Sequence, residues 1–335
     1  MSIITVTNVN KTYKVFERPK GFKAVATSLF KRNYKDVNAI IDLNFKIQQG
    51  ELIGYIGPNG AGKSTTIKML CGLLAPTSGE ILLSGVDPIK KRKTNAMQIG
   101  VVFGQRSQLN WDLPMEDTFE VYKIMYKIDD ARYKRNVAFY TELLDMGEFL
   151  RTPIRQLSLG QKMRAELAVA MLHDPKILYL DEPTIGLDVV VKQKIRSFIK
   201  EVNKDRGVTV ILTTHDMRDI EEVCSRIMLI NKGKLLFDGS QKNFRDNYSA
   251  GNRMSVLLEP KEGDSLKPLS GEFILVEQTD DPQSSYPLAR KIIDIPRSGD
   301  ASADIILKLM QDYKIVDLQV TIPSIEDIVR KIYGD

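Results

Sequence analysis

Apolar residues in the first part of the chain fall into short runs that alternate with stretches of helical periodicity. The runs are rich in β-branched residues and end at Ile56, Phe103, Leu180 and Thr213, and each is followed by a helical pattern. Parallel strands need a long crossover connection, usually a helix, and this alternation is the corresponding sequence pattern. We therefore predict an α/β fold built on a parallel sheet.

Between residues 111 and 172 the pattern becomes wholly helical. Apolar residues there recur three or four positions apart, as on one face of a helix. They form two stripes, with Phe119, Tyr122, Met125 and Tyr126 on the first and Val137, Tyr140, Leu143 and Leu144 on the second. We predict a helical subdomain, at about residues 106–172, inserted into the sheet domain.

The pattern changes again after the polar stretch at residues 241–252. Short strands are predicted at 254–258, 273–277 and 291–295, a helix at 303–313, and a closing strand and helix within 316–333. These elements are typical of a small α+β unit. We expect a boundary near residue 245, which gives a larger domain at 1–245 and a C-terminal domain at 246–335.

The composition is that of a soluble globular protein, with 43% apolar and 27% charged residues in a chain of 335. The longest apolar runs, at 177–180 and 208–212, are far shorter than the roughly 18 residues that cross a bilayer. The N-terminal residues lack the charged and apolar regions of a signal peptide. Cys71 and Cys224 each lie in an apolar helical pattern rather than a paired framework, so we expect a reducing compartment.

The strongest chemical signal is the run from Gly57 to Thr65, which matches G-x-x-x-x-G-K-[ST] after the predicted strand 52–56. Its glycines let backbone N–H groups curl around phosphate oxygens, and the next helix offers its positive N-terminus. Lys63 would reach the β- and γ-phosphates, and Ser64 would bind magnesium. An ordinary glycine-rich turn is the alternative, which the strand–loop–helix context disfavours. The predicted contacts are Gly57, Pro58, Asn59, Gly60, Ala61, Gly62, Lys63, Ser64 and Thr65.

A second signal is the pair Asp181 and Glu182, which follows the buried-strand run 177–180. Acidic residues after a strand are more often turn or cap residues. The phosphate loop changes that interpretation, because a nucleoside triphosphatase needs a carboxylate-bearing strand end beside the loop. Asp181 would then hold magnesium, and Glu182 would polarise the water that attacks the γ-phosphate.

A third signal is the segment 157–161, with the sequence Leu-Ser-Leu-Gly-Gln. Ser158 and Gln161 have the spacing of a capping box at a helix start, and this is the simpler interpretation of the segment. The number of residues between Ser158 and Asp181, however, resembles the spacing between the signature motif and the strand-end aspartate in ATP-binding-cassette (ABC) ATPases. The alternatives differ in consequence, because a signature motif contacts ATP.

The other elements of that family stand at matching places between about Ile3 and Gly239. Gln105, after the predicted strand 99–103, resembles the Q-loop glutamine, Asp188 the D-loop aspartate and His215 the switch histidine. Tyr13 resembles the aromatic residue that stacks on adenine. The resemblance implies catalytic roles for Glu182, His215, Gln105 and Lys63, magnesium contacts at Ser64, Gln105 and Asp181, and further ATP contacts at Tyr13, Ser158, Gly160, Gln161 and Asp188.

Elementary fold geometry supports this assignment independently. Gly57, Gln105, Asp181 and His215 each lie just beyond a predicted strand, and open parallel sheets bind ligands at the carboxyl ends of their strands. His215 on its own would more often be a structural histidine. The other histidine, His173, is better explained as a turn or cap residue than as a catalytic one.

Two positions depart from the common family pattern. Leu159 stands where the signature usually has glycine, which affects the detail of the phosphate contact. Tyr13 lies farther from Gly57 than in compact members, because a basic segment intervenes. Tyr34 is therefore a rival for the adenine contact, and a tyrosine packed at a strand edge is the structural alternative.

The resemblance implies a P-loop NTPase sheet core and the role of an ATPase subunit, with ATP and Mg²⁺ as cofactors, whose permease is encoded on other chains. Residues 181–188 and 323–328 look most like ATPases of ABC-2-type exporters. We expect ATP-driven closure of two subunits of the same sequence at the cytoplasmic face of the membrane. A soluble ABC-type regulator or translation factor is the alternative, although such translation factors resemble two cassettes and this sequence has one phosphate loop.

Charge and a single tryptophan bear on possible partners. The net charge of +5 is too small to predict nucleic-acid binding. Residues 18–35 carry basic and apolar side chains and no acidic one, which suits a helix at a membrane surface, with a solvated insertion as the alternative. Gln105 and residues 107–115 are predicted to contact the permease, with Trp111 as an anchor unless it is buried in the helical subdomain. Residues 250–335 are predicted to dimerise or regulate and to carry no catalytic chemistry.

Overall fold

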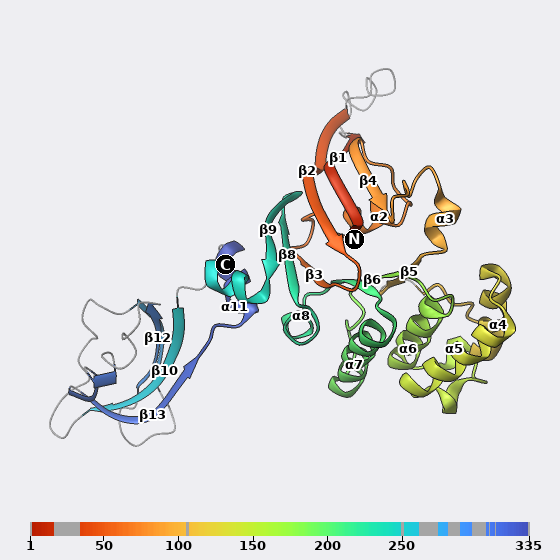
Figure 1. Cartoon of the computed structure of the whole chain (residues 1–335). Helices are drawn as coiled ribbons and strands as arrows, with labels where there is room; N and C mark the ends of the chain where they lie inside the picture. The colour runs from red at the N-terminus through yellow and green to blue at the C-terminus, as the bar shows by residue number, and fades with distance from the viewer. Residues whose placement is uncertain are drawn as a thin grey trace, which may run out of the picture. The chain divides into compact units, whose positions relative to one another are not determined.

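The computed structural model describes residues 2–16, 34–104, 107–248, 251–260, 274–280, 289–296, 306–307, 309–311 and 313–333. The chain divides into two compact units, Met1–Gln241 and Lys242–Asp335 (Figure 1). In the described part of the chain, no helix combines the length and apolar character needed to cross a membrane. Gln105 and most of the basic segment at 18–35 lie outside the described residues.

The larger unit is built on a six-stranded sheet in the order β5-β6-β7-β3-β8-β9. Strands from β5 to β8 run parallel, and β9 pairs antiparallel with β8. β6 and β7 are buried along almost their whole length, as is usual for parallel strands covered on both faces. The predicted α/β class is confirmed. The strands are β3 (Leu52–Ile56), β5 (Ile99–Phe103), β6 (Ile177–Asp181), β7 (Thr209–Thr213), β8 (Arg226–Asn231) and β9 (Lys234–Ser240).

A helix follows each of three parallel strands of this sheet. These helices are α2 (Lys63–Leu70) after β3, α7 (Val189–Arg206) after β6 and α8 (Met217–Val223) after β7. The ends of α7 follow from its sequence: Asp188 caps the first turn with its carboxylate, and Gly207 ends the helix in the left-handed conformation at a φ of 62°. The loops that leave β3, β6 and β7 consequently share one edge of the sheet.

A second, antiparallel sheet has the order β2-β1-β4 and was not identified from the sequence. Its strands are β1 (Ser2–Phe16), β2 (Tyr34–Gln48) and β4 (Ser78–Leu83), and the short helix α3 (Arg92–Ala96) follows β4. Ile4, Leu43 and Ile47 of this sheet are fully buried and join Ile53 and Tyr55 of β3 in one hydrophobic cluster. The two sheets therefore share a core. The pairing of β1 with β4 is distant in sequence, and local periodicity carries no information about such pairs.

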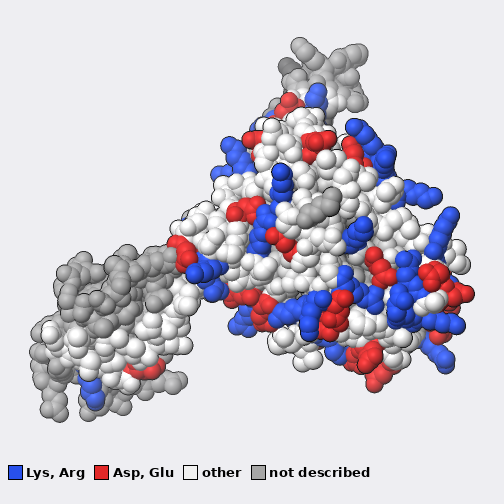
Figure 2. All heavy atoms as spheres, viewed as in Figure 1, with Lys and Arg blue, Asp and Glu red and all other residues white. Residues whose placement is uncertain are grey.

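The predicted helical subdomain contains α4 (Met115–Tyr126), α5 (Asp130–Leu143) and α6 (Leu159–Met171), with single 3₁₀ turns at Gly147–Phe149 and Ile154–Gln156. Figure 1 shows these helices together at one side of the sheet. Phe119 and Tyr140 from the two predicted stripes are fully buried, whereas Met125 stays 56% exposed. On the face seen in Figure 2, basic and acidic side chains are interspersed across the surface of the larger unit.

The smaller unit contains a four-stranded antiparallel sheet in the order β11-β12-β10-β13, followed by α11. Its core includes Met254, Val256 and Tyr313. The predicted helix at 303–313 runs too far, because Tyr313 already pairs with Pro260 as the first residue of β13. Ile325 and Ile328 in α11 are buried. The elements are α9 (Gln241–Tyr248), β10 (Gly251–Pro260), β11 (Ile274–Asp280), β12 (Ala289–Pro296), β13 (Tyr313–Thr321) and α11 (Ile325–Tyr333).

Candidate nucleotide-binding site

The glycine-rich loop between β3 and α2 has a shape that only glycine permits at its key positions. Gly62 adopts a φ of 115°, and a Cβ there would come within 2.6 Å of the Ile40 side chain. A Cβ on Gly57 would come within 2.3 Å of the carbonyl oxygen of Ile230. Both contacts are too close for any side chain, so the motif glycines follow from backbone geometry. The loop leads directly into the N-terminus of α2, where backbone N–H groups favour an anion.

Lys63, the first residue of α2, folds its side chain back into this loop. Its Nζ donates hydrogen bonds to the carbonyl oxygens of Gly57 at 2.6 Å and Pro58 at 3.3 Å. Burial lowers the pKa of Lys63, while the charges of Glu182 and Asp181 oppose that shift. The ammonium group is thus a buried donor whose present partners are loop carbonyls, and phosphate oxygens in the loop would be stronger, charged acceptors.

Ser64 and Asp181 place two oxygen groups side by side although they come from different elements. The hydroxyl of Ser64 donates to Asp181 Oδ2 at 3.3 Å, and the hydroxyl of Thr213 donates to Asp181 Oδ1. A hydroxyl beside a carboxylate fits Mg²⁺, which prefers oxygen ligands and usually adds substrate phosphates and water to one or two protein groups. The donor set therefore fits the predicted cation.

Glu182 occupies a strained position at the end of β6. Its backbone is left-handed, with a φ of 59°, and its N–H donates to the carbonyl oxygen of Thr213 at 2.9 Å. Conformations of this kind persist only where the surroundings hold them, and they cluster at functional sites. Burial raises the pKa of the Glu182 carboxyl, and the positive charges of His215 and Lys63 oppose the rise. Its Oε1 lies 3.1 Å from Nε2 of His215.

These groups line a single cavity of about 580 Å³. Five of its lining residues were not predicted as site residues from the sequence, namely Lys68, Leu73, Phe103, Gly104 and Ile185. Lys68 lies one turn after Ser64 on α2, a spacing that could have indicated it. The predicted residues that line the cavity are Pro58, Asn59, Gly60, Ala61, Gly62, Lys63, Ser64, Thr65, Asp181, Glu182 and His215.

The predicted adenine contacts lie outside this cavity lining. Tyr13 in β1 pairs with Val37 of β2, and Nζ of Lys11 lies 5.3 Å from its ring centre. Tyr34 at the start of β2 packs edge-to-face on Phe16, with ring centres 6.2 Å apart. Both tyrosines thus remain candidates, and the adenine contact stays a prediction. Gln105 is outside the described residues, so its predicted roles stay predictions as well.

The signature segment forms the capping box and leaves much of its surface exposed. The Gln161 N–H donates to Ser158 Oγ at 3.2 Å, and the Ser158 N–H donates to Gln161 Oε1 at 2.8 Å. The structural interpretation of this segment therefore holds at the start of α6. Ser158, Gly160, Gln161 and Asp188 are outside the lining of the cavity in their own chain. The predicted contacts of these four residues with ATP stay predictions.

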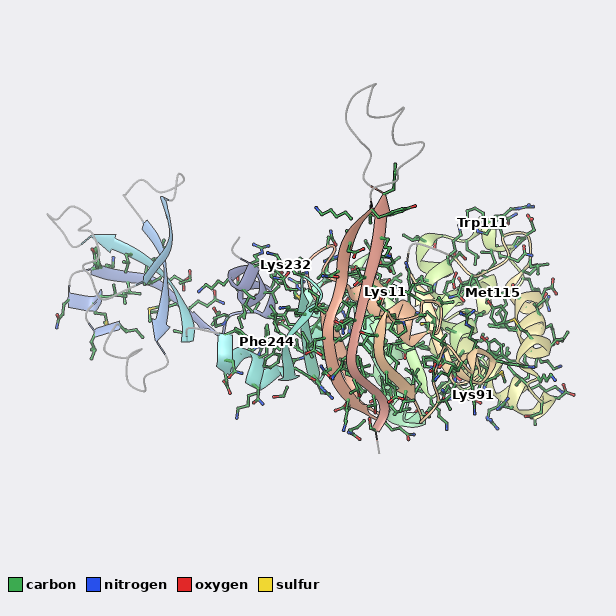
Figure 3. The ribbon with its side chains drawn as sticks, turned by 90° about the horizontal axis from the view of Figure 1, so that it is seen from above. Lys11, Lys91, Trp111, Met115, Lys232 and Phe244 are labelled. Atoms are coloured by element: carbon green, nitrogen blue, oxygen red, sulfur yellow. The ribbon has the colours of Figure 1, made fainter. Side chains whose placement is uncertain are left out.

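For His173 and Trp111 the sequence left a structural and a functional interpretation open, and the structure shows where each side chain lies. His173 is buried: its ring stacks on Tyr126 with centres 3.9 Å apart, its Nε2 lies 3.0 Å from the Ile99 carbonyl oxygen, and burial lowers its pKa to about 4. Trp111 is 59% exposed, with Nζ of Lys162 5.0 Å from its ring centre. Figure 3 shows it at the periphery of the helical subdomain. The alternative of a buried tryptophan is wrong.

Known proteins are similar to this chain in sequence and in fold. The family model described as ABC transporter matches residues 40–185. The uncharacterized ABC transporter ATP-binding protein YhcH of Bacillus subtilis (strain 168) is 30% identical over 91% of this chain and 94% of its own length. The probable multidrug ABC transporter ATP-binding protein YbhF of Escherichia coli (strain K12) is 35% identical over 68% of this chain, which spans only 39% of YbhF.

Solved structures agree with these relatives. A dimeric bacterial ABC transporter cassette is 26% identical, with a TM-score of 0.60 over 71% of this chain and 98% of that one. A dimeric cassette in a post-hydrolysis state, bound to ADP and Pi, is 25% identical with a TM-score of 0.58 and the same coverage. The glycine-rich loop, the acidic strand end and these similarities lead to one conclusion: the chain belongs to the ABC transporter family, as an ATP-binding subunit with ATPase activity and a P-loop NTPase core.

Proposed function

We propose that this subunit powers a separate membrane permease by closing on a second copy of itself around two ATP molecules. The proposal rests on the positions of the phosphate-loop and signature residues within one chain. Lys63, Asp181 and Glu182 line the cavity, whereas Ser158 and Gly160 are outside its lining. A nucleotide held by the phosphate loop of one subunit would meet the signature helix of the other, through a hydroxyl and backbone N–H groups at the N-terminus of α6.

Exposed apolar residues beside these motifs support closure on a second copy. Leu159 in the signature is 51% exposed, and Ile185, which also lines the cavity, is 46% exposed. Val189 and Val190, which follow Asp188 at the start of α7, are 78% and 75% exposed. Exposed apolar side chains next to these motifs are expected at a face that a partner covers. We place Asp188 and Gln161 at the same interface.

The proposed chemistry uses the groups already in place. Ser64 and Asp181 would hold Mg²⁺, which when bound neutralises charge on the β- and γ-phosphates. Lys63 would bind the γ-phosphate. Glu182 accepts a proton from the attacking water, and its raised pKa makes it a stronger base than an ordinary carboxylate. His215 orients Glu182 and would bind the γ-phosphate, and Gln105 is proposed to join the magnesium site.

We further propose export as the direction of transport and the cytoplasmic face of the membrane as the location. YbhF, named a probable multidrug ABC transporter ATP-binding protein, supports export. The exposed Trp111 supports a permease contact in the segment 107–115. We also assign residues 18–35 to the membrane surface and 246–335 to regulation or dimerisation. In the soluble-regulator alternative no permease would bind, and co-purification with a polytopic membrane protein separates the two functions.

Glu182→Gln is the direct test of the proposed mechanism. The amide keeps the size of the side chain and the phosphate-binding loop is untouched, so ATP should still bind. The amide cannot accept a proton from the attacking water, so turnover should fall by at least about 100-fold. Size-exclusion chromatography should then show a larger fraction of dimer for this variant with ATP than for the wild-type subunit with ADP. Unchanged turnover in this variant would reject Glu182 as the base.

A further inference from the structure

We propose that Asp219, a buried aspartate on α8, is a positioning residue that keeps the loop carrying Glu182 aligned with the loop carrying His215. This proposal rests on the catalytic roles proposed above for these two residues. Asp219 is 1% exposed. Its Oδ2 accepts hydrogen bonds from Thr184 Oγ1 at 2.5 Å and Thr214 Oγ1 at 3.2 Å. Neither Thr184 nor Asp219 lines the cavity, so any influence on hydrolysis passes through other residues.

The two threonines belong to two different loops of the site. Thr184 lies two residues beyond Glu182, in the loop that leaves β6. Thr214 directly precedes His215, in the loop that leaves the neighbouring strand β7. One carboxylate oxygen thus joins the two loops just behind the residues that face each other in the cavity. The pairing between β6 and β7 ends at Asp181 and Thr213. The hydrogen bonds to Asp219 therefore align the two loops beyond the ends of the strands.

The hydroxyl group of Thr214 also restrains the turn that carries His215. The hydroxyl oxygen of Thr214 accepts the N–H of Asp216 at 3.0 Å, so its own proton points to Asp219. The residues on both sides of His215 are therefore held through a single hydroxyl. Without the Asp219 carboxylate, Thr214 would lose its acceptor, and the turn from Thr214 to Asp216 would no longer be held in this way.

Asp219 is itself anchored by α7. Its Oδ1 accepts the Nε of Arg196 at 2.7 Å, and Nη1 of Arg196 donates to Glu222 at 2.9 Å. Arg196 is only 6% exposed, so this is a buried and mutually compensated ion pair. With donors on both oxygens, the carboxylate is fully satisfied and holds a fixed orientation. α7 begins beside the D-loop, so the anchor also links the catalytic loops to the proposed dimer face.

The strained backbone of Glu182 explains why such a clamp would affect catalysis. A left-handed glutamate relaxes unless the chain is held on both sides. On one side its N–H is bonded to Thr213, and on the other Thr184 is bonded to Asp219. Without the Thr184 bond, the Glu182 carboxylate should sample positions unsuited to proton transfer. The phosphate loop has no part in this network, so ATP binding should be spared.

Thr184→Val and Thr184→Ser form a matched pair that tests the proposal in the full chain. Valine keeps the shape of threonine but lacks the hydroxyl, and serine keeps the hydroxyl. A misplacement of about 1 Å can cost on the order of 100-fold in rate, so we expect Thr184→Val to lower kcat at least about tenfold. KM for ATP should change less than about twofold. Thr184→Ser should retain most of kcat, and Thr184→Val with Thr214→Val should act non-additively.

A second variant separates positioning from general destabilisation. Ile195→Val removes one methylene from a fully buried residue of α7 next to Arg196 in the sequence, and leaves every donor to Asp219 intact. It should lower the melting temperature while kcat stays within about twofold of wild type. An equal loss of kcat in Ile195→Val, or a wild-type kcat in Thr184→Val, would overturn the proposal. If Glu182→Gln also turned over normally, the proposed catalytic base would be wrong instead.

Discussion

Nε2 of His215 lies 3.1 Å from Oε1 of Glu182, across the ends of two adjacent strands. The pairing of Asp181 with Thr213 brings these strand ends level, and each residue follows its strand by one or two positions. The Glu182 side chain is only 15% exposed, whereas that of His215 is 49% exposed. A sheltered carboxylate therefore faces a histidine that can reach solvent or a bound phosphate.

This contact predicts the pH dependence of ATP hydrolysis. A general base works only when deprotonated, and burial raises the pKa of Glu182. Activity should therefore be lost on acidification at a higher pH than for an ordinary glutamate, whose pKa is about 4.3. Because positive charge on His215 lowers the pKa of Glu182, His215→Gln should move the acid limb to still higher pH. The measurement is kcat against pH, and a limb that stays in place or moves to lower pH contradicts the prediction.

Ser64→Ala should separate magnesium use from nucleotide binding. The variant loses the hydroxyl that now bonds to Asp181, but keeps the backbone N–H groups that would hold phosphate. The Mg²⁺ concentration for half-maximal ATPase activity should rise and kcat should fall by about 100-fold. Ser64→Thr is the matched control, since the motif accepts either hydroxyl residue. Nucleotide affinity measured in EDTA should be equal in all three proteins; a selective loss of that affinity in Ser64→Ala would contradict the assignment.

Gly160→Ala should fold normally yet weaken ATP-driven dimerisation. Its Cβ would lie 3.1 Å from a Val191 methyl, which can shift slightly, but it would add bulk to the signature surface that we assign to the partner's nucleotide. In the Glu182→Gln background, the trapped dimer should dissociate at least about tenfold more readily, a change of about 1.4 kcal/mol. Gly147→Ala, where a Cβ meets no atom within 4 Å, is the control. Equal dimer stability in both variants would remove Gly160 from the interface.

Much of the site could be predicted because its determinants are local. The glycine-rich loop, Asp181 and His215 all follow buried strands, and parallel register brings strand ends to one edge without further information. The helical subdomain was equally accessible, since Phe119 and Tyr140 lie on stripes of helical period. These features depend on residues close in sequence.

The features that escaped prediction depend on partners far apart in sequence. The β2-β1-β4 sheet needs pairing between β1 and β4, which periodicity does not encode. Asp219 and Arg196 each look like solvated helix residues until α7 and α8 are packed together. Tyr313 was assigned to a helix because its neighbours have helical spacing, but pairing with β10 makes it a strand residue. In each case tertiary contact outweighs the local pattern.

Trp111→Ala should weaken permease binding without unfolding the subunit. The side chain is 59% exposed and its ring packs on Lys162, a contact worth about 0.5–1 kcal/mol at such a surface. ATP binding should therefore be unchanged, whereas the fraction of subunit that co-purifies with its permease should drop. Met97→Ala, at another exposed apolar position, is the control. Full retention of permease binding by folded Trp111→Ala would exclude the tryptophan as an anchor.

Removal of the smaller unit should leave nucleotide binding intact and weaken association between subunits. The cut belongs after Gln241 rather than near residue 245, because Phe244 in α9 is fully buried and would lose neighbours. Gln241 should be kept, since its side-chain amide donates to the carbonyl oxygens of Ile220 at 2.8 Å and Glu221 at 3.2 Å in α8. The remaining unit retains the hydrophobic core, the cavity and the signature helix.

If the smaller unit holds two subunits together between hydrolysis cycles, it raises their effective concentration and speeds closure. The truncated protein should then bind ATP as tightly as the full chain but lose nucleotide-free association. Its specific ATPase activity should fall as the protein is diluted, while that of the full chain changes less. Sedimentation and activity measured across a dilution series provide both readouts. A truncated protein that is folded yet unable to bind ATP would instead give residues 242–335 a direct role at the site.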